Sequence, residues 1–242
     1  MRRSAQLSMW MQAFLSRWCF LLISVISVSF HGSIQAQTSE AIEQQRRILS
    51  PYQAQIQQRL EAFKPLIHKL FRQLEQQKLP AELILLPMLE SSYNANAISP
   101  QQAAGLWQLM PATAERFGLQ VTEQNDQRFD IDASTQAALR YLSFLYRKFD
   151  QNLNLTLAAY NAGEGRVATA IKAAKSTDFS QLTLPKETQI YVSRFQALKQ
   201  LIDVYKLRHE RTPIFLIFGD GKAAPNQPLI DLTPLPPLIS LP

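Results

Sequence analysis

Apolar residues recur at intervals of three and four along most of this chain, and this periodicity constrains its fold more than any other feature. Such spacing places apolar side chains on one face of a helix. Pro65 lies inside the first such run, so we expect either a kink or two helices in residues 40–78. Residues 79–208 contain no alternating apolar–polar pattern of the kind that half-buried strands show, and we predict an all-α fold. The apolar positions of the first run are Ile56, Leu60, Phe63, Ile67, Leu70 and Leu74.

Several shorter helices are predicted after Pro80. The first, at 81–91, is apolar nearly throughout and should be buried, with Pro87 interrupting its hydrogen bonding near the end. Ser134 can cap a helix that begins at the next residue. The last helix follows Pro185 and should carry one apolar stripe formed by Phe195, Leu198, Ile202 and Tyr205. The helices predicted between the first and the last cover residues 111–118, 135–149, 153–161 and 164–175.

Residues 1–36 follow the order of a secretory signal. Arginines and no acid occur in the first 18 residues, an uncharged run follows at 19–30, and Ala36 is the small residue at the expected cut. The uncharged run is shorter than the roughly 20 apolar residues that a membrane-spanning helix needs. We predict export and cleavage after Ala36. The alternative is an uncleaved signal that anchors the chain in the membrane.

Cleavage would change the charge and the side chains available for chemistry. The full chain has 25 Lys and Arg against 19 Asp and Glu, and the signal removes three arginines, which leaves a net charge of +3. No basic stripe then remains, which argues against nucleic-acid binding. Cys19 and His31 are also lost, so His68 and His209 are the remaining histidines. This excludes a thiol nucleophile, a cysteine zinc site and any site that needs three histidines.

The chain therefore divides into four predicted parts. These are a signal peptide (1–36), a helical N-terminal extension (37–78), a main helical domain (79–208) and a proline-rich tail (209–242). The tail has too many prolines for regular structure, apart from a short apolar run at 214–218 that could form a strand. A membrane surface or an envelope protein, if one binds, should dock on the tail or on the N-terminal helix.

Glu90 is the first candidate for chemistry, because it directly follows an apolar stretch that includes Met88 and Leu89. Apolar surroundings raise the pKa of a carboxyl group, since the charged form loses its solvation. A carboxylic acid that is still protonated near neutral pH can act as a general acid. The alternative is a helix-end residue paired with a backbone amide or an arginine.

A second candidate region, residues 103–111, combines small, aromatic and amide side chains. Gly105 permits a close approach to the backbone. Trp107 and Met110 offer apolar surface and Gln108 offers amide hydrogen bonds, a mixture that suits a sugar ring with an N-acetyl group. The alternative is a tight loop packed by Trp107.

Two further candidates lie on predicted helices. Tyr160 and Asn161 end a helix beside Gly163, where the alternative is an ordinary helix cap with a buried tyrosine. Glu187 and Tyr191 are four residues apart and share one helical face, a pairing that is unremarkable on its own.

Taken together, these motifs resemble those of a known family. Their order and spacing are similar to those of the lytic transglycosylases with the soluble-lytic-transglycosylase (SLT) catalytic domain, glycoside hydrolase family 23. The resemblance covers residues 79–207. It implies a lysozyme-like α-helical domain that acts on peptidoglycan glycan strands in the periplasm of a Gram-negative-type envelope, without a metal or cofactor. The motifs are Glu90-Ser91, Gly105-Leu106-Trp107-Gln108, Ala159-Tyr160-Asn161-Ala162-Gly163 and Glu187-Thr188 with Tyr191-Val192.

The resemblance also implies a role for each matching residue. Glu90 matches the single catalytic acid of the family, and Ser99 matches a serine beside that acid. The residues that match the substrate groove are Gln108, Met110, Tyr160, Asn161, Glu187 and Tyr191.

The number of carboxylates separates the possible reactions. Ordinary glycosidases use two carboxylates, about 5–5.5 Å apart when retaining and about 6.5–9.5 Å apart when inverting. Here Asp126, Asp130 and Asp132 lie in or beside a polar loop, and none can be assigned a second catalytic role. The resemblance implies cleavage between N-acetylmuramic acid and N-acetylglucosamine with formation of a 1,6-anhydro end. The alternatives are hydrolysis by a muramidase of the goose-lysozyme kind and a non-catalytic peptidoglycan-binding envelope protein.

Overall fold

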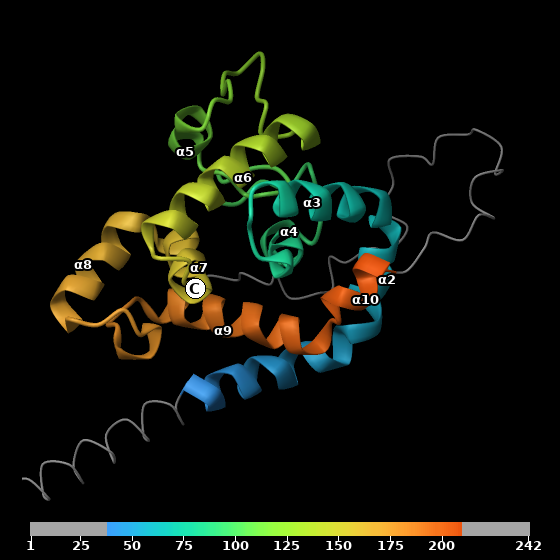
Figure 1. The fold of residues 1–242 in the computed structure, drawn as a ribbon. Coiled ribbons are helices and arrows are strands. Elements are labelled where there is room, and N and C mark those ends of the chain that lie inside the picture. The colour runs from blue at the N-terminus through green and yellow to red at the C-terminus, as the bar shows by residue number, and fades with distance from the viewer. Residues whose placement is uncertain (1–37, 210–242) are drawn as a thin grey trace, which may run out of the picture. The chain divides into compact units, whose positions relative to one another are not determined.

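The computed structural model describes residues 38–209, which are mainly helical. Within these residues the model contains isolated β-bridges and no strand, which confirms the predicted all-α fold class (Figure 1). Helix α2 follows a helical stretch at 42–49 and a short 3-10 helix. The elements are η1 (Ser50–Tyr52), α2 (Gln53–Ala62), α3 (Lys64–Gln76), η2 (Ala81–Leu85), α4 (Leu86–Ser91), α5 (Pro111–Arg116), α6 (Ile131–Lys148), α7 (Leu153–Ala162), α8 (Glu164–Ala174), η3 (Phe179–Gln181), α9 (Lys186–Leu201) and α10 (Val204–His209).

The break predicted in the N-terminal helical run occurs at Phe63, between α2 and α3. Pro65 lies in the first turn of α3, where its missing N–H costs no helical hydrogen bond. The apolar stripe of these helices is buried almost completely, at Ile56, Leu60, Ile67, Leu70 and Leu74. The N-terminal helices are therefore packed against the rest of the core.

The segment of η2 and α4 lies inside the core. All seven residues from Leu83 to Leu89 are buried. The 3-10 helix η2 contacts α3, α4 and α9, whereas α7 packs against α6, α8 and α9 (Figure 1). Pro87 does not interrupt the end of this segment as predicted, because it lies in the first turn of α4, directly after the change from 3-10 to α-helix.

The start of α6 and the end of α9 also differ from the prediction. Helix α6 begins at Ile131, and its cap is the side chain of Asp130, which accepts a hydrogen bond from the N–H of Ala133 at 2.8 Å. Ser134 is instead a buried residue inside the helix. At the other end, α9 stops at Leu201, so the expected stripe does not extend to Tyr205, which is 70% exposed on α10.

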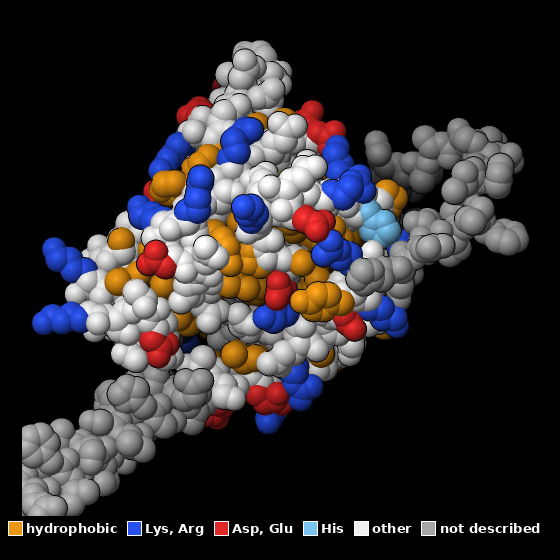
Figure 2. All heavy atoms as spheres, in the orientation of Figure 1, with side chains coloured by type: hydrophobic (Ala, Val, Ile, Leu, Met, Phe, Trp, Pro, Cys, Tyr) orange, Lys and Arg blue, Asp and Glu red, His pale blue; other side chains and the backbone are white. Residues whose placement is uncertain are grey.

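The surface carries both signs of charge. On the face drawn in Figure 2, basic and acidic side chains are interspersed around exposed apolar atoms. No helix among residues 38–209 is long and apolar enough to cross a membrane. The predicted signal at 1–36 and nearly all of the predicted tail, including the run at 214–218, lie outside the described residues, and the predicted domain boundaries stay predictions.

Candidate active site

Glu90 lies near the end of α4, a helix of six residues whose other side chains are mostly buried. Burial raises the pKa of its carboxyl group to about 8, because the charged form would lose solvation. The hydroxyl of Tyr191 donates a hydrogen bond to Oε1 of Glu90, which lowers this pKa and partly opposes the effect of burial. At neutral pH most of the Glu90 side chains are therefore protonated.

Two tyrosines from different helices surround this acid. Tyr191 of α9 is buried, and Tyr160 of α7 is partly buried. Burial and the negative charge of Glu90 both raise the pKa of each phenol. Tyr160 donates its O–H to the backbone carbonyl of Trp107 at 2.7 Å, and its ring lies 5.3 Å from that of Tyr141. Three of the sequence motifs thus converge on Glu90 from α7, α9 and the loop before α5.

The loop that contains Gly105 and Gln108 is tied to α4. Ser91 donates its O–H to the backbone carbonyl of Leu106 at 2.8 Å. The side-chain amide of Gln108 donates to the carbonyl oxygens of Ala97 at 3.1 Å and Gly105 at 2.9 Å. Gln108 therefore stabilises the loop through its amide hydrogens.

The two apolar side chains of this loop have different environments. Trp107 is fully buried and donates its indole N–H to Oγ1 of Thr135 at 3.0 Å, so it packs the loop, as the alternative interpretation held. Met110 is 44% exposed and is available to a ligand.

Gly105 does allow a close approach to the backbone, but the approaching group belongs to the protein. Its φ is +79°, and a Cβ atom built there would lie 1.9 Å from the carbonyl oxygen of Arg128. Arg128 is itself buried, and its guanidinium donates to the carbonyl oxygens of Gln102 at 2.7 Å and Leu109 at 3.1 Å. Asp126 holds this guanidinium with an Nη2–Oδ2 distance of 2.6 Å, and Arg128 in turn lowers the pKa of Asp126.

The interpretation of the sequence did not identify Arg128. The only signal in the sequence is an acid and an arginine two residues apart in a polar loop, a pattern that does not by itself indicate a structural role. The partner carbonyls are distant in sequence, so only the folded chain reveals that this arginine holds the loop in place.

Among the predicted site residues, Tyr191 alone has a described hydrogen bond to Glu90, and Ser99, Asn161 and Glu187 have no described contact with the other residues of the site. The hydroxyl oxygen of Ser99 accepts from the N–H of Ala103 at 3.0 Å, within its own loop. Asn161 is partly buried at the end of α7, and Glu187 is exposed in the first turn of α9, one turn before Tyr191. Their roles in binding stay predictions.

Three further carboxylates have partners of their own. Asp130 caps α6, and Asp132 pairs with Lys69 at 2.6 Å. Glu164 pairs with Arg116 at 2.7 Å, which lowers the pKa of Glu164. No group of three or more metal-binding side chains occurs in the part of the chain that the structure describes.

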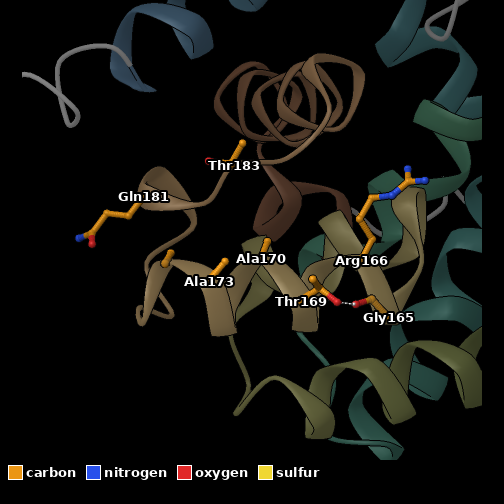
Figure 3. A pocket seen from close by; sticks show the side chains of 8 residues that line it. Gly165, Arg166, Thr169, Ala170, Ala173, Gln181 and Thr183 are labelled. Atoms are coloured by element: carbon orange, nitrogen blue, oxygen red, sulfur yellow. Dashed lines mark hydrogen bonds between the residues drawn. The ribbon is translucent and has the colours of Figure 1, made fainter.

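A surface pocket of about 550 Å³ lies apart from these residues, along α8 and the segment that leads to α9 (Figure 3). Its walls are mainly small side chains of α8, with Arg166 at one end and Gln181 and Thr183 across from them. None of the predicted site residues lines it.

The fold and the site together define a helical domain in which a tyrosine holds a carboxyl group of raised pKa, beside a loop that is hydrogen-bonded to the same helix. Residues 70–183 match the protein family described as "Transglycosylase SLT domain". This match confirms the resemblance seen in the sequence motifs for this part of the chain.

Two curated proteins illustrate the similarity of this chain to known sequences. The chain is 42% identical over 153 residues to membrane-bound lytic murein transglycosylase D of Escherichia coli K12, a match that covers 62% of this chain and 34% of the relative. It is also 42% identical over 112 residues to a putative tributyltin chloride resistance protein of Alteromonas sp. M-1, covering 46% of this chain and 54% of the relative. The chain thus spans about a third and about half of these relatives.

Solved structures of lytic transglycosylases are also similar to the chain. The 70-kDa soluble lytic transglycosylase in complex with bulgecin A is 28% identical, with a TM-score of 0.49 over 59% of this chain and 25% of that protein.

Proposed function

We propose that this protein is a peptidoglycan lytic transglycosylase. It would cleave the β-1,4 bond between N-acetylmuramic acid and N-acetylglucosamine and leave a 1,6-anhydromuramyl end. The proposal is carried by Glu90, a carboxyl group whose pKa is raised by burial and which Tyr191 holds by a hydrogen bond, within a region that matches the SLT family. The names of the transglycosylase relatives support the same substrate class.

In the first step Glu90 acts as the general acid. Its proton goes to the glycosidic oxygen while the bond from that oxygen to C1 of the muramyl sugar breaks. N-acetylglucosamine leaves as an alcohol, and the acetamide of the muramyl residue stabilises the positive charge that develops at C1. The raised pKa supports this role, because it keeps the proton on Glu90 at neutral pH.

In the second step the ionised Glu90 acts as the base. It removes the proton from the 6-hydroxyl of the same muramyl sugar, whose oxygen then bonds to C1. The nucleophile is part of the substrate, so closure is intramolecular and gains from proximity. Tyr191 supports this step, since its hydrogen bond stabilises the carboxylate form of Glu90. Glu90 ends the cycle protonated again and no water is consumed.

The groove beside Glu90 would be formed by residues from the loop and from α7 and α9. Met110 offers an exposed apolar contact for the N-acetyl or lactyl groups of the glycan. Asn161 and Glu187 would supply polar contacts from the ends of their helices. We further propose export to the periplasm, where the glycan strands would be reached.

The test is a digest of purified murein sacculi, with products separated by mass. A transglycosylase releases products that are about 18 Da lighter than those of hydrolysis, because intramolecular closure replaces the addition of one water. Reducing-end products would instead identify a muramidase. Binding to sacculi without release of products would identify a peptidoglycan-binding protein. The control is Glu90→Gln, which should bind sacculi and release no products.

A further inference from the structure

The N-terminal helices contact both elements that carry the candidate site. Arg59 of α2 donates its Nε–H to the backbone carbonyl of Ser92 at 2.8 Å, two residues beyond Glu90. Three residues after Tyr191, Arg194 of α9 donates its Nε–H to Oε1 of Gln45 at 2.9 Å. Gln45 and Arg59 both precede residues 70–183, which match the SLT family.

The turn after α4 adopts an unfavourable backbone conformation. Ser92 and Tyr93 have φ values of +52° and +62°, a left-handed region that residues other than glycine adopt uncommonly. Their N–H groups donate to the carbonyl oxygens of Met88 and Pro87, each at 3.1 Å. The turn folds back on the helix that carries Glu90, so contacts that hold the turn also hold that helix.

Arg59 and Phe63 form a layered contact on this turn. The guanidinium of Arg59 lies 5.1 Å from the ring centre of Phe63, whose ring centre is 5.3 Å from that of Tyr93. Tyr93 is fully buried and donates its O–H to the carbonyl of Ile84 at 2.5 Å. Arg59 is partly buried, and a charged donor forms a stronger hydrogen bond than a neutral one.

A second set of contacts holds α9. Gln45 is buried where it accepts the hydrogen bond from Arg194. Gln53 of α2 donates its side-chain amide to the carbonyl of Leu201, the last residue of α9, at 2.9 Å. Helix α9 is thus held at two points by the same segment that holds the turn after α4.

We propose that residues 42–63 position Glu90 against Tyr191, and that Arg59 is the principal positioning residue. The inference rests on the proposed function, in which Glu90 is the acid. Arg59 acts through the carbonyl of Ser92 and the turn that follows Glu90. The contacts that carry the inference are the hydrogen bonds of Arg59, Gln45 and Gln53 and the packing of Phe63.

Removal of Arg59 would shift the pKa of Glu90 in opposite directions under two explanations, and the direction therefore tests the inference. If Arg59 only supplied positive charge, its loss would raise the pKa of Glu90, because a nearby cation favours the carboxylate. If Arg59 positions the helix, its loss admits water to Glu90 and lowers the pKa, since burial is what raises it. The titratable groups that interact with Glu90 are Tyr191 of α9 and Tyr160 of α7, and neither is substituted in this experiment.

The experiment is an NMR titration of the protein labelled with ¹³C at the glutamate carboxyl carbons, with Glu90 assigned from Glu90→Gln. We expect Arg59→Met to bring the pKa of Glu90 from about 8 to below about 7. Arg59→Lys, which keeps a charged donor, should fall between that variant and the wild type. An unchanged or higher pKa in Arg59→Met overturns the proposal.

Arg147→Met is the matched control, because Arg147 also donates from Nε to a backbone carbonyl, but on the exposed surface of α6. Its Glu90 pKa should equal that of the wild type, and an equal fall there also overturns the proposal. If circular dichroism shows that Arg59→Met does not fold, the pKa of Glu90 is measured in Phe63→Leu and in Arg59→Lys. We expect it to fall below the wild-type value in both variants.

The titration needs no enzyme activity, which separates this inference from the proposed function. If the wild type leaves sacculi intact while Arg59→Met lowers the pKa of Glu90, the positioning role stands and the proposed function fails. If the wild type releases anhydro products and the pKa does not fall, the proposed function stands and the positioning role fails.

Discussion

The hydroxyl of Tyr191 donates a hydrogen bond to the carboxyl of Glu90, although the two residues are 101 positions apart in the sequence. This bond joins α4 to α9 at a carboxyl group whose pKa is raised by burial. Two influences on the pKa of Glu90 oppose each other. Burial favours the neutral form and raises the pKa, whereas the hydrogen bond favours the charged form and lowers it. The balance between them sets the pH at which Glu90 can give up a proton and take one back.

Tyr191→Phe should therefore raise the pKa of Glu90 and slow the reaction. Loss of a hydrogen bond to a charged group costs about 1.5–3 kcal/mol, which corresponds to a fall in kcat of roughly ten- to a hundredfold. Activity should decline at a higher pH than in the wild type, since Glu90 then keeps its proton longer. The check is a pH profile of anhydro-product release, with Tyr205→Phe, on the exposed surface of α10, as the control. An unshifted profile would contradict the assigned role.

The folded protein should lose stability as the pH rises. The pKa of Glu90 is raised on folding, from 4.5 to about 8, so its contribution to stability is complete below pH 4.5 and is lost as the pH rises through 8. Glu90→Gln carries no such charge and should lose less in Tm between pH 5 and 9. Thermal melts of both proteins across that range test the sign. A steeper loss in Glu90→Gln than in the wild type would show that Glu90 is not buried as described.

Sequence patterns predicted the helices and the members of the site better than the contacts among them. The apolar stripe from Ile56 to Leu74 fixed α2 and α3, because period and burial are both local properties of the chain. That Glu90 and Tyr191 belong to one site could be inferred only from the family resemblance, and their hydrogen bond was not predicted, since no local rule relates residues so far apart. The prediction that Ser134 caps α6 was wrong. Asp130 and Ser134 both satisfy the local preference for a cap, and packing against the core decides between them.

The loop after α4 shows a different limit of sequence reasoning. The sequence correctly predicts that another group approaches the backbone closely at Gly105, but it does not say which group. The answer, the carbonyl of Arg128, depends on a buried arginine whose guanidinium binds two carbonyl groups of this loop, 26 and 19 residues before it. Trp107 was likewise a candidate surface for a sugar, and only its burial shows that it packs the core.

Gly105→Ala should destabilise the protein strongly, because the new Cβ would lie 1.9 Å from the carbonyl oxygen of Arg128 and φ is +79°. The strain of a left-handed residue alone costs about 1–3 kcal/mol, and the clash adds to it. Gly165→Ala is the matched control, since nothing lies within 4 Å of its Cβ and the residue is helical. That variant should be unchanged or more stable by about 0.5–1 kcal/mol. Urea unfolding of the two variants measures the difference, and similar midpoints would contradict the described loop.

Met110→Ala tests the glycan groove separately from the acid. Met110 is 44% exposed and lies at the start of α5, so truncation should change the free energy of unfolding by no more than about 0.5 kcal/mol. Loss of its apolar contact with the glycan should cost about 1–2 kcal/mol of binding, equivalent to a roughly five- to thirtyfold rise in KM with kcat nearly unchanged. Tyr205→Ala, which removes another exposed apolar side chain on α10, should leave KM as it is. Kinetics on soluble glycan strands make the comparison. Equal KM values for the two variants would show that Met110 does not contact the substrate, whereas a loss confined to kcat would assign it to the reacting centre.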